Sequence, residues 1–322
     1  MVGEAGPRRH EWDGLSHSPV WCLLFVGWRR PPLDEGGADG AVTARDDDLD
    51  EIDALARRAA DGDRDALSEL VRRLQHPMYR LALRFLGHPE DAKDACQEIL
   101  VRLVTHLGSF EGRSRFTTWA YTLATRSLLR TKKRFVETAV RGPEEFAAFL
   151  DAGIAEADPT MEEAEYRLLC EEVRISCTYG MLLCIPRPQR AAYLLADVVG
   201  LTDVEGADVL GCSREAFRQR VSRARRTLRY VIDNRCGLVD PANPCRCGRQ
   251  IGASEEAGIL RRDHLPLAEH PREEVRVWIE PLAKQLDEVV AIGDLYRFDR
   301  FVAPEALWNE LVERYPTLLD LG

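Results

Sequence analysis

Arginine is concentrated in one short stretch of this chain, residues 213–229. Seven arginines stand there against a single acid, Glu215, although the 322-residue chain as a whole has a formal net charge of −10. Guanidinium groups bind phosphate oxygens and can pair bidentately with the major-groove edge of guanine. The local charge therefore indicates contact with DNA. The seven are Arg214, Arg218, Arg220, Arg223, Arg225, Arg226 and Arg229.

Two short helices are predicted to position these arginines. Residues 200–213 end in the sequence Leu-Gly-Cys-Ser, which predicts a helix-turn-helix with Ser213 as the N-cap of the second helix. Gly206 lies in the first helix, where glycine costs about 1 kcal/mol relative to alanine, so we expect that helix to be weakened. Early residues of the second helix reach base edges in such motifs, and later ones contact phosphate. The expected base-reading residues are Arg214, Phe217, Arg218 and Arg220, and the expected phosphate-binding residues are Arg223, Arg225, Arg226 and Arg229.

A second basic patch, residues 113–134, carries seven bases and no acid. Aromatic side chains interleave with the bases, a combination that suits a DNA strand being melted, because phosphate is neutralised and unstacked bases find stacking surfaces. The alternative is that Trp119 and Tyr121 are core residues beneath a solvated basic face. The candidate melting residues are Arg113, Arg115, Phe116, Trp119, Tyr121, Arg126, Arg130, Lys132 and Lys133.

Helical periodicity runs through most of the chain and strand signals are nearly absent, so the predicted fold class is all-α: two small helical domains, an acidic linker and a helical C-terminal extension. Thr160 and Glu163 predict a capping box at the start of the second domain. Residues 1–41 lack periodicity, and translation starting at Val42 is one hypothesis for them. The predicted boundaries are a disordered segment at 1–48, the first domain at 49–136, the linker at 137–160, the helix-turn-helix domain at 161–235, and a Cys-containing loop with the extension at 236–322.

Three cysteines, Cys236, Cys245 and Cys247, fall within twelve residues. They could hold zinc with a fourth ligand from Cys184, His264 or His270. A redox-sensitive thiol cluster and a plain structural loop are the other interpretations, and no cofactor besides zinc is expected. No apolar run reaches the ~18–20 residues that a membrane-spanning helix needs, so we expect no membrane insertion. The nine cysteines lack the density and spacing of a secreted disulfide scaffold, so we expect reduced thiols and a cytoplasmic protein.

Two segments, in this order, resemble extracytoplasmic-function (ECF) sigma factors of bacterial RNA polymerase. Residues 89–100 with the Phe-Thr-Thr-Trp-Ala-Tyr sequence at 116–121 resemble sigma region 2, and residues 181–230 resemble sigma region 4. The resemblance implies binding to the polymerase core, to its β′ clamp helices and β flap, recognition of −35 and −10 promoter elements, and in some cases an anti-sigma factor. It also implies that an acidic helix docks on the β′ clamp helices. The residues of that helix are Glu90, Asp91, Asp94, Gln97 and Glu98.

The end of the chain, around Tyr296 and Phe301, resembles the regulatory C-terminal extensions of some ECF sigma factors. We expect it to pack on region 2 or region 4 and to tune promoter binding. The main alternative function is a helix-turn-helix regulator that acts without polymerase. An enzyme is not expected, because the sequence has no P-loop, no His-Glu-x-x-His and no nucleophile motif.

Overall fold

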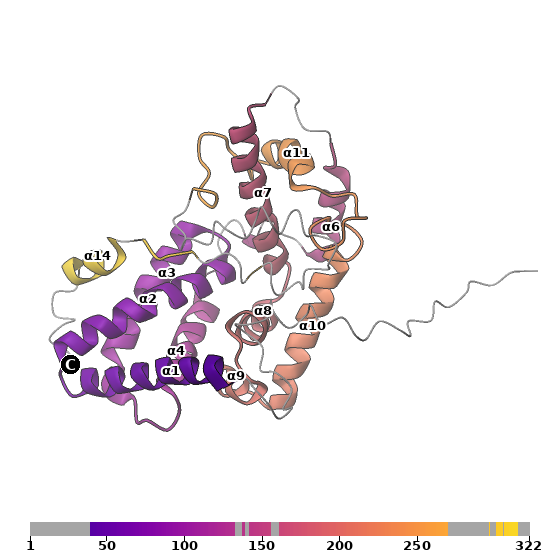
Figure 1. Ribbon diagram of the computed structural model, residues 1–322. Helices are drawn as coiled ribbons and strands as arrows, with labels where there is room; N and C mark the ends of the chain where they lie inside the picture. The colour runs from indigo at the N-terminus through magenta and orange to yellow at the C-terminus, as the bar shows by residue number, and fades with distance from the viewer. Residues whose placement is uncertain are drawn as a thin grey trace, which may run out of the picture. The chain divides into compact units, whose positions relative to one another are not determined.

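The structure is a computed structural model of the chain. It divides into two compact units, Met1–Asp47 and Asp48–Gly322, and the second unit contains both basic patches. The regular elements of the described residues are helices, which confirms the all-α prediction (Figure 1). The residues that the structure describes are 39–132, 137–138, 142–155, 161–269, 296, 301–304 and 306–314.

Helix α1 spans Asp39–Ala60, so the prediction that residues 39–48 are disordered is wrong. The remainder of that predicted segment, residues 1–38, lies outside the described residues. Asp53 of α1 accepts a hydrogen bond from the backbone N–H of Phe116 at 2.7 Å. This carboxylate satisfies one of the N–H groups that a helix leaves unpaired at its start. It also connects α1 to the helix of the second basic patch, which begins at Phe116.

In the described part of the first domain, three α-helices follow α1, and local sequence sets their ends. Asp63 caps the first of them through a 3.0 Å hydrogen bond from the N–H of Ala66, and Gly87 ends it in the left-handed conformation with φ 76°. Pro89 then starts the next helix, where its missing N–H costs nothing. The elements are α2 (Arg64–Leu86), α3 (Pro89–Thr105), the short 3-10 turn η2 (Leu107–Ser109) and α4 (Phe116–Arg130).

The predicted acidic linker contains a helix, α6 (Pro143–Ala152), which buries Ala147 and Leu150 and packs against α7 and α10. Its described part is therefore folded against the second domain rather than a bare tether. Helix α7 spans Glu163–Leu183, and its N-cap residue is Glu162, whose side chain makes no capping hydrogen bond. The predicted capping box of Thr160 and Glu163 is wrong, because Glu163 is the first residue of the helix.

The rest of the second domain and the extension consist of shorter elements. The helix-turn-helix is formed by α9 (Asp203–Leu210) and α10 (Arg214–Ile232), as predicted. Before it come α8 (Arg187–Tyr193) and a π-helical segment, η3 (Leu194–Val199); after it come η4 (Cys247–Gln250), α11 (Ile251–Glu256) and α14 (Ala306–Arg314).

One hydrophobic core runs through both predicted domains. It contains buried side chains from α2, α3 and α4, and equally from α7, α8 and α10. The helix-turn-helix has a small core of its own around Phe217, and a third cluster lies between α7 and the segment 251–265. The two domains are therefore packed together in this structure. Among the described helices, none is both long enough and apolar enough to cross a bilayer.

Candidate nucleic-acid interface

Hydrogen bonds fix both helix starts of the helix-turn-helix. Thr202 Oγ1 accepts from the N–H of Glu205, and the Glu205 carboxylate accepts from the N–H of Thr202 at 2.8 Å, a complete capping box. Gly211 makes the turn in the left-handed conformation, with φ 59°. Ser213 Oγ then accepts from the N–H of Ala216 at 3.1 Å, which confirms the predicted N-cap of α10.

Gly206 and Phe217 have a role that the sequence did not reveal. A Cβ atom on Gly206 would lie 2.1 Å from Cζ of the Phe217 ring, far inside van der Waals contact. Glycine is therefore what lets α9 and α10 approach around this ring. The Phe217 side chain is only 2% exposed, so its prediction as a base-reading residue is wrong: it is the centre of the motif's core. The expected weakening at Gly206 is accordingly offset by packing.

We expect Gly206→Ala to destabilise the protein by about 1–3 kcal/mol, because overpacking a filled core outweighs the gain in helix propensity of about 1 kcal/mol. Urea-induced unfolding measures the change. Gly252→Ala is the matched control, since Gly252 is also helical and has open space where the Cβ would stand. A Gly206→Ala variant as stable as the Gly252→Ala variant would contradict this account. Adding Phe217→Leu should recover part of the loss.

The arginines of α10 face outward. Arg220 is half-buried, and the other six predicted DNA-binding arginines are exposed. Acids on neighbouring elements form ion pairs with some of these arginines. The Asp203 carboxylate lies 3.1 Å from Arg214 and 3.5 Å from Arg218. Asp197 forms a bidentate ion pair with Arg225. DNA would have to compete with these carboxylates. Arg223, Arg226 and Arg229 have no ion pair among the described residues.

The second basic patch lies on and beside α4. Arg126, Arg130 and Lys132 are exposed there, whereas Lys133 is outside the described residues. Two bases before the helix are paired with acids: Arg113 with Glu111, and Arg115 with Asp50 at 3.0 Å. The positive surface available to phosphate is therefore concentrated at the C-terminal end of α4.

The three aromatic candidates of this patch occupy different environments. Phe116 is fully buried under Trp119, with ring centroids 5.3 Å apart, so its prediction as a melting residue is wrong. Trp119 is half-buried on the same cluster and Tyr121 is half-buried as well, between the main core and the helix-turn-helix core. Both keep some exposed surface, and their proposed roles in melting stay predictions.

The five candidate polymerase-binding residues share one face of α3. Glu90, Asp94 and Glu98 are exposed, and Asp91 and Gln97 are half-buried. Two nearby side chains are already engaged from far along the chain: Lys93 Nζ and Gln97 Nε2 each donate to the carboxylate of Glu310 at 2.9 Å. Part of the predicted docking face is therefore covered by α14.

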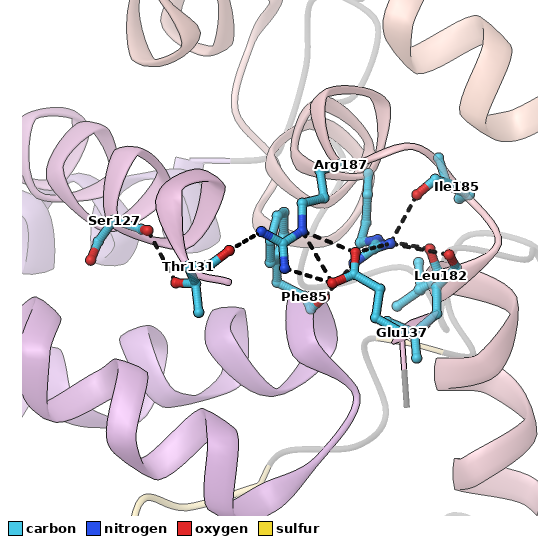
Figure 2. Close-up of polar contacts among 9 residues, drawn as sticks. Phe85, Ser127, Thr131, Glu137, Leu182, Ile185 and Arg187 are labelled. Carbon is cyan, nitrogen blue, oxygen red and sulfur yellow. Dashed lines mark hydrogen bonds and ion pairs between the residues drawn. The ribbon is translucent and has the colours of Figure 1, made fainter. Parts of the chain in front are cut away.

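A buried charge network joins the two predicted domains, and Figure 2 shows Glu137 and Arg187 at its centre. The side chain of Arg190 is 1% exposed and that of Glu137 is 5% exposed. Arg187 donates to both Glu137 oxygens, at 2.6 and 2.9 Å, and also to the carbonyl of Thr131 at the end of α4. Charge-assisted pairs of this kind are strong once they are formed in a dry site.

Arg190 connects more groups than any other side chain of this network. It donates to Glu137 at 3.1 Å and to backbone carbonyls of four other residues at 2.7–3.1 Å; the four are Phe85, Leu182, Leu183 and Ile185. Burial lowers the pKa of Arg190 to about 10, and the charge of Glu137 opposes that shift. Burial alone would raise the pKa of Glu137, but the hydrogen bond from Arg187 and the charge of Arg190 hold it below its usual value.

Sequence reasoning missed this network. In the sequence, Glu137 is only the first residue of the predicted acidic linker, and Arg190 is only one residue of the stretch 181–230 that resembles region 4. The available signal was a single carboxylate directly after the basic patch, which does not identify its partners fifty residues away.

The cysteine loop is held by backbone pairing. Cys236 and Cys245 form an isolated β-bridge. Burial raises the pKa of all three thiols of the loop, that of Cys247 to about 12. Across the described part of the chain, which excludes His270, no three His, Cys, Asp or Glu side chains gather as metal ligands. Zinc binding by Cys236, Cys245 and Cys247 therefore stays a prediction.

Comparison with known proteins matches the two domains to one family. The family model for sigma-70 region 2 matches residues 70–135, and that for sigma-70 region 4 matches residues 176–228. The RNA polymerase sigma-H factor of Pseudomonas aeruginosa is 29% identical over 177 residues, which cover 54% of this chain and 90% of that protein. The ECF RNA polymerase sigma-E factor of Escherichia coli K12 is 30% identical over 184 residues, 56% of this chain and 92% of that protein.

A similar solved structure is that of CnrH in complex with the cytosolic domain of CnrY, with a TM-score of 0.41, 25% identity, and coverage of 57% of this chain and 97% of that chain. The helix-turn-helix, the helical first domain and the sequence matches together define the class. The protein is a sigma factor of the sigma-70 family, and it belongs to the ECF subfamily. The second of the two matched ranges ends at residue 228, so the cysteine loop and α14 lie beyond both.

Proposed function

We propose that this sigma factor binds core RNA polymerase through the acidic face of α3, holds the −35 duplex with α10, and opens the −10 element on the surface of α4. The observation that carries the proposal is the separation of charge along one chain: an acidic helix, a basic surface with half-exposed aromatics, and an arginine-rich second helix of a helix-turn-helix. Each surface has the chemistry that its target requires. The site of action is then the bacterial cytoplasm, where core polymerase works.

Among the arginines, the exposed Arg214 and Arg218 in the first turns of α10 are the proposed base-reading residues, together with the half-buried Arg220. Ser213, Arg223, Arg225, Arg226 and Arg229 are proposed to position the duplex through phosphate. On α4, the proposed contacts to the melted strand are Trp119, Tyr121, Arg126, Arg130 and Lys132.

Promoter binding requires the packed arrangement to open. The two promoter elements lie about 55 Å apart if ~16 base pairs separate them at ~3.4 Å each. In the structure α4 packs directly against α9, and Tyr121 contacts the helix-turn-helix core. The α4–α9 contact therefore has to break before both elements can be occupied. An anti-sigma factor that binds the packed form is a further proposed partner.

The test is reconstitution with the cognate core polymerase. We expect the full-length protein to bind core and to start RNA synthesis at defined sites on genomic DNA, read by sequencing the transcripts. Asp94→Lys should weaken core binding about tenfold, because a charge on the docking face is reversed. Glu256→Lys, an exposed reversal on α11, is the control and should leave core affinity unchanged.

The alternative, a regulator that acts without polymerase, predicts a different pattern: duplex binding by α10 with no measurable affinity for core. That pattern, with the Asp94→Lys variant indistinguishable from wild type, would overturn the proposal.

A further inference from the structure

Near the end of the C-terminal extension, Tyr296 and residues 301–304 are docked along α2 through their backbone. Arg84 Nε donates to the carbonyl of Tyr296 at 2.9 Å, Arg80 Nε donates to the carbonyl of Phe301 at 2.7 Å, and the N–H of Ala303 donates to His76 Nδ1 at 2.9 Å. The three α2 residues stand four positions apart, so they form one row on one face of the helix. This row provides hydrogen-bonding partners for the backbone of Tyr296 and of the segment 301–304.

Two aromatic side chains of the segment reach from the region 2 helix into region 4. Tyr296 is 1% exposed, its hydroxyl donates to the carbonyl of Thr178 at 3.1 Å, and its ring meets that of Tyr193 edge-on with centroids 6.0 Å apart. Phe301 is fully buried and lies 6.4 Å from the ring of Tyr179. Side chains of region 2 bind the backbone of the segment, and region 4 receives the aromatic side chains of the segment. The segment therefore stabilises the packing of region 2 on region 4.

Helix α14 then lies on α3 and α2. Leu307 and Leu311 are buried in the main core, and Glu310 of the same helix receives hydrogen bonds from Lys93 and Gln97 of α3. Gln97 belongs to the proposed polymerase-binding face. A helix seated on this side chain occupies surface that the polymerase would need.

We propose that the docked tail, meaning Tyr296, residues 301–304 and residues 306–314, is an inhibitor built into the chain. It holds region 2 against region 4 and covers part of the α3 face, so that its docking and the binding of core polymerase exclude each other. The proposal rests on the proposed function of α3 as the polymerase-binding helix. The segment that covers the α3 face belongs to the chain itself. It is bound by a row of α2 side chains, by aromatic contacts to Tyr179 and Tyr193, and by the ion pair of Glu310 with Lys93.

Glu310→Lys tests the proposal with little risk to folding, because Glu310 is 40% exposed. The substitution replaces the attraction to Lys93 by repulsion, and we expect it to tighten core binding about fivefold and to raise transcript yield at limiting sigma factor. Glu313→Lys is the matched control, with the same charge change on the exposed side of the same helix, and it should behave as wild type. The charge swap Lys93→Glu with Glu310→Lys should return core affinity towards the wild-type value.

A second measurement follows docking directly. Hydrogen exchange of residues 301–314 in the full-length protein should accelerate in Glu310→Lys and, more strongly, when core polymerase is added to the wild type. If core binds but Glu310→Lys has the affinity of Glu313→Lys, and exchange of the tail is unchanged by core, the inhibitor proposal is overturned while the proposed function stands. If neither wild type nor Glu310→Lys binds core, the proposed function fails first, and the inhibitor proposal fails with it.

Discussion

Replacing Arg190 with methionine is expected to lower the free energy of unfolding by about 3–5 kcal/mol, the cost of removing one partner from a buried ion pair. Methionine fills a similar volume but donates no hydrogen bond. It would leave the Glu137 carboxylate with Arg187 alone and would strip a donor from four buried backbone carbonyls. Urea-induced unfolding at neutral pH measures the loss.

Arg167→Met is the control for this experiment. Arg167 also pairs with an acid, Glu163, but its side chain is 67% exposed, so we expect a change below about 0.5 kcal/mol. Adding Glu137→Gln to Arg190→Met should cost less than Glu137→Gln in the wild type, because the charge of Glu137 is then no longer well compensated. A loss below about 1 kcal/mol for Arg190→Met would show that the network does not stabilise the packed arrangement.

The second large effect is expected on α10. Removing Arg223, Arg226 and Arg229 together should weaken binding to duplex DNA by on the order of 10²-fold near 50 mM salt, because three phosphate contacts and their counterion release are lost. The slope of log K against log salt should fall by about 2.7, since each contact contributes about 0.9. Fluorescence anisotropy with a random-sequence duplex and the full-length protein gives both quantities.

Arg167→Ala again provides the control, with one exposed arginine removed outside α10 and no expected change in slope. Arg218→Ala should affect a different property of DNA binding from the triple variant. It should alter the preference among duplex sequences more than the salt dependence, because Arg218 lies in the first turns that reach base edges. A triple variant with the slope of the wild type would mean that these arginines do not contact phosphate.

The contrast between Ser213 and Phe217 shows which features were predictable. Ser213 is predicted correctly as an N-cap because its Oγ accepts from the N–H of Ala216, only three residues on. The position of Phe217 in the first turns of α10 predicts a place on the DNA surface, but the space left by Gly206 on the facing helix takes its ring into the core. Whether a side chain of α10 points to solvent or into the core depends on where α9 lies. The position of α9 is set by tertiary packing and not by the residues next to Phe217 in the sequence.

The prediction of disorder at residues 39–48 and the predicted capping box are wrong for a related reason. A helix can begin at any of several acceptable residues, so its start is hard to predict. Helix α1 begins at Asp39, earlier than the sequence predicts. The N-cap of α7 is Glu162, later than the predicted Thr160.

By itself the sequence determined the all-α class, the helix-turn-helix with its arginines, the basic-aromatic helix and the acidic helix, since these follow from periodicity, capping and charge over a few turns. Only the tertiary structure decided that Gly206 seats the Phe217 ring, that Arg190 joins the two regions, and that Glu310 lies on Lys93. Glu310 and Lys93 are 217 residues apart. Such contacts depend on the packing of whole helices and on the loss of water around paired charges, and neither is encoded in the spacing of neighbouring residues.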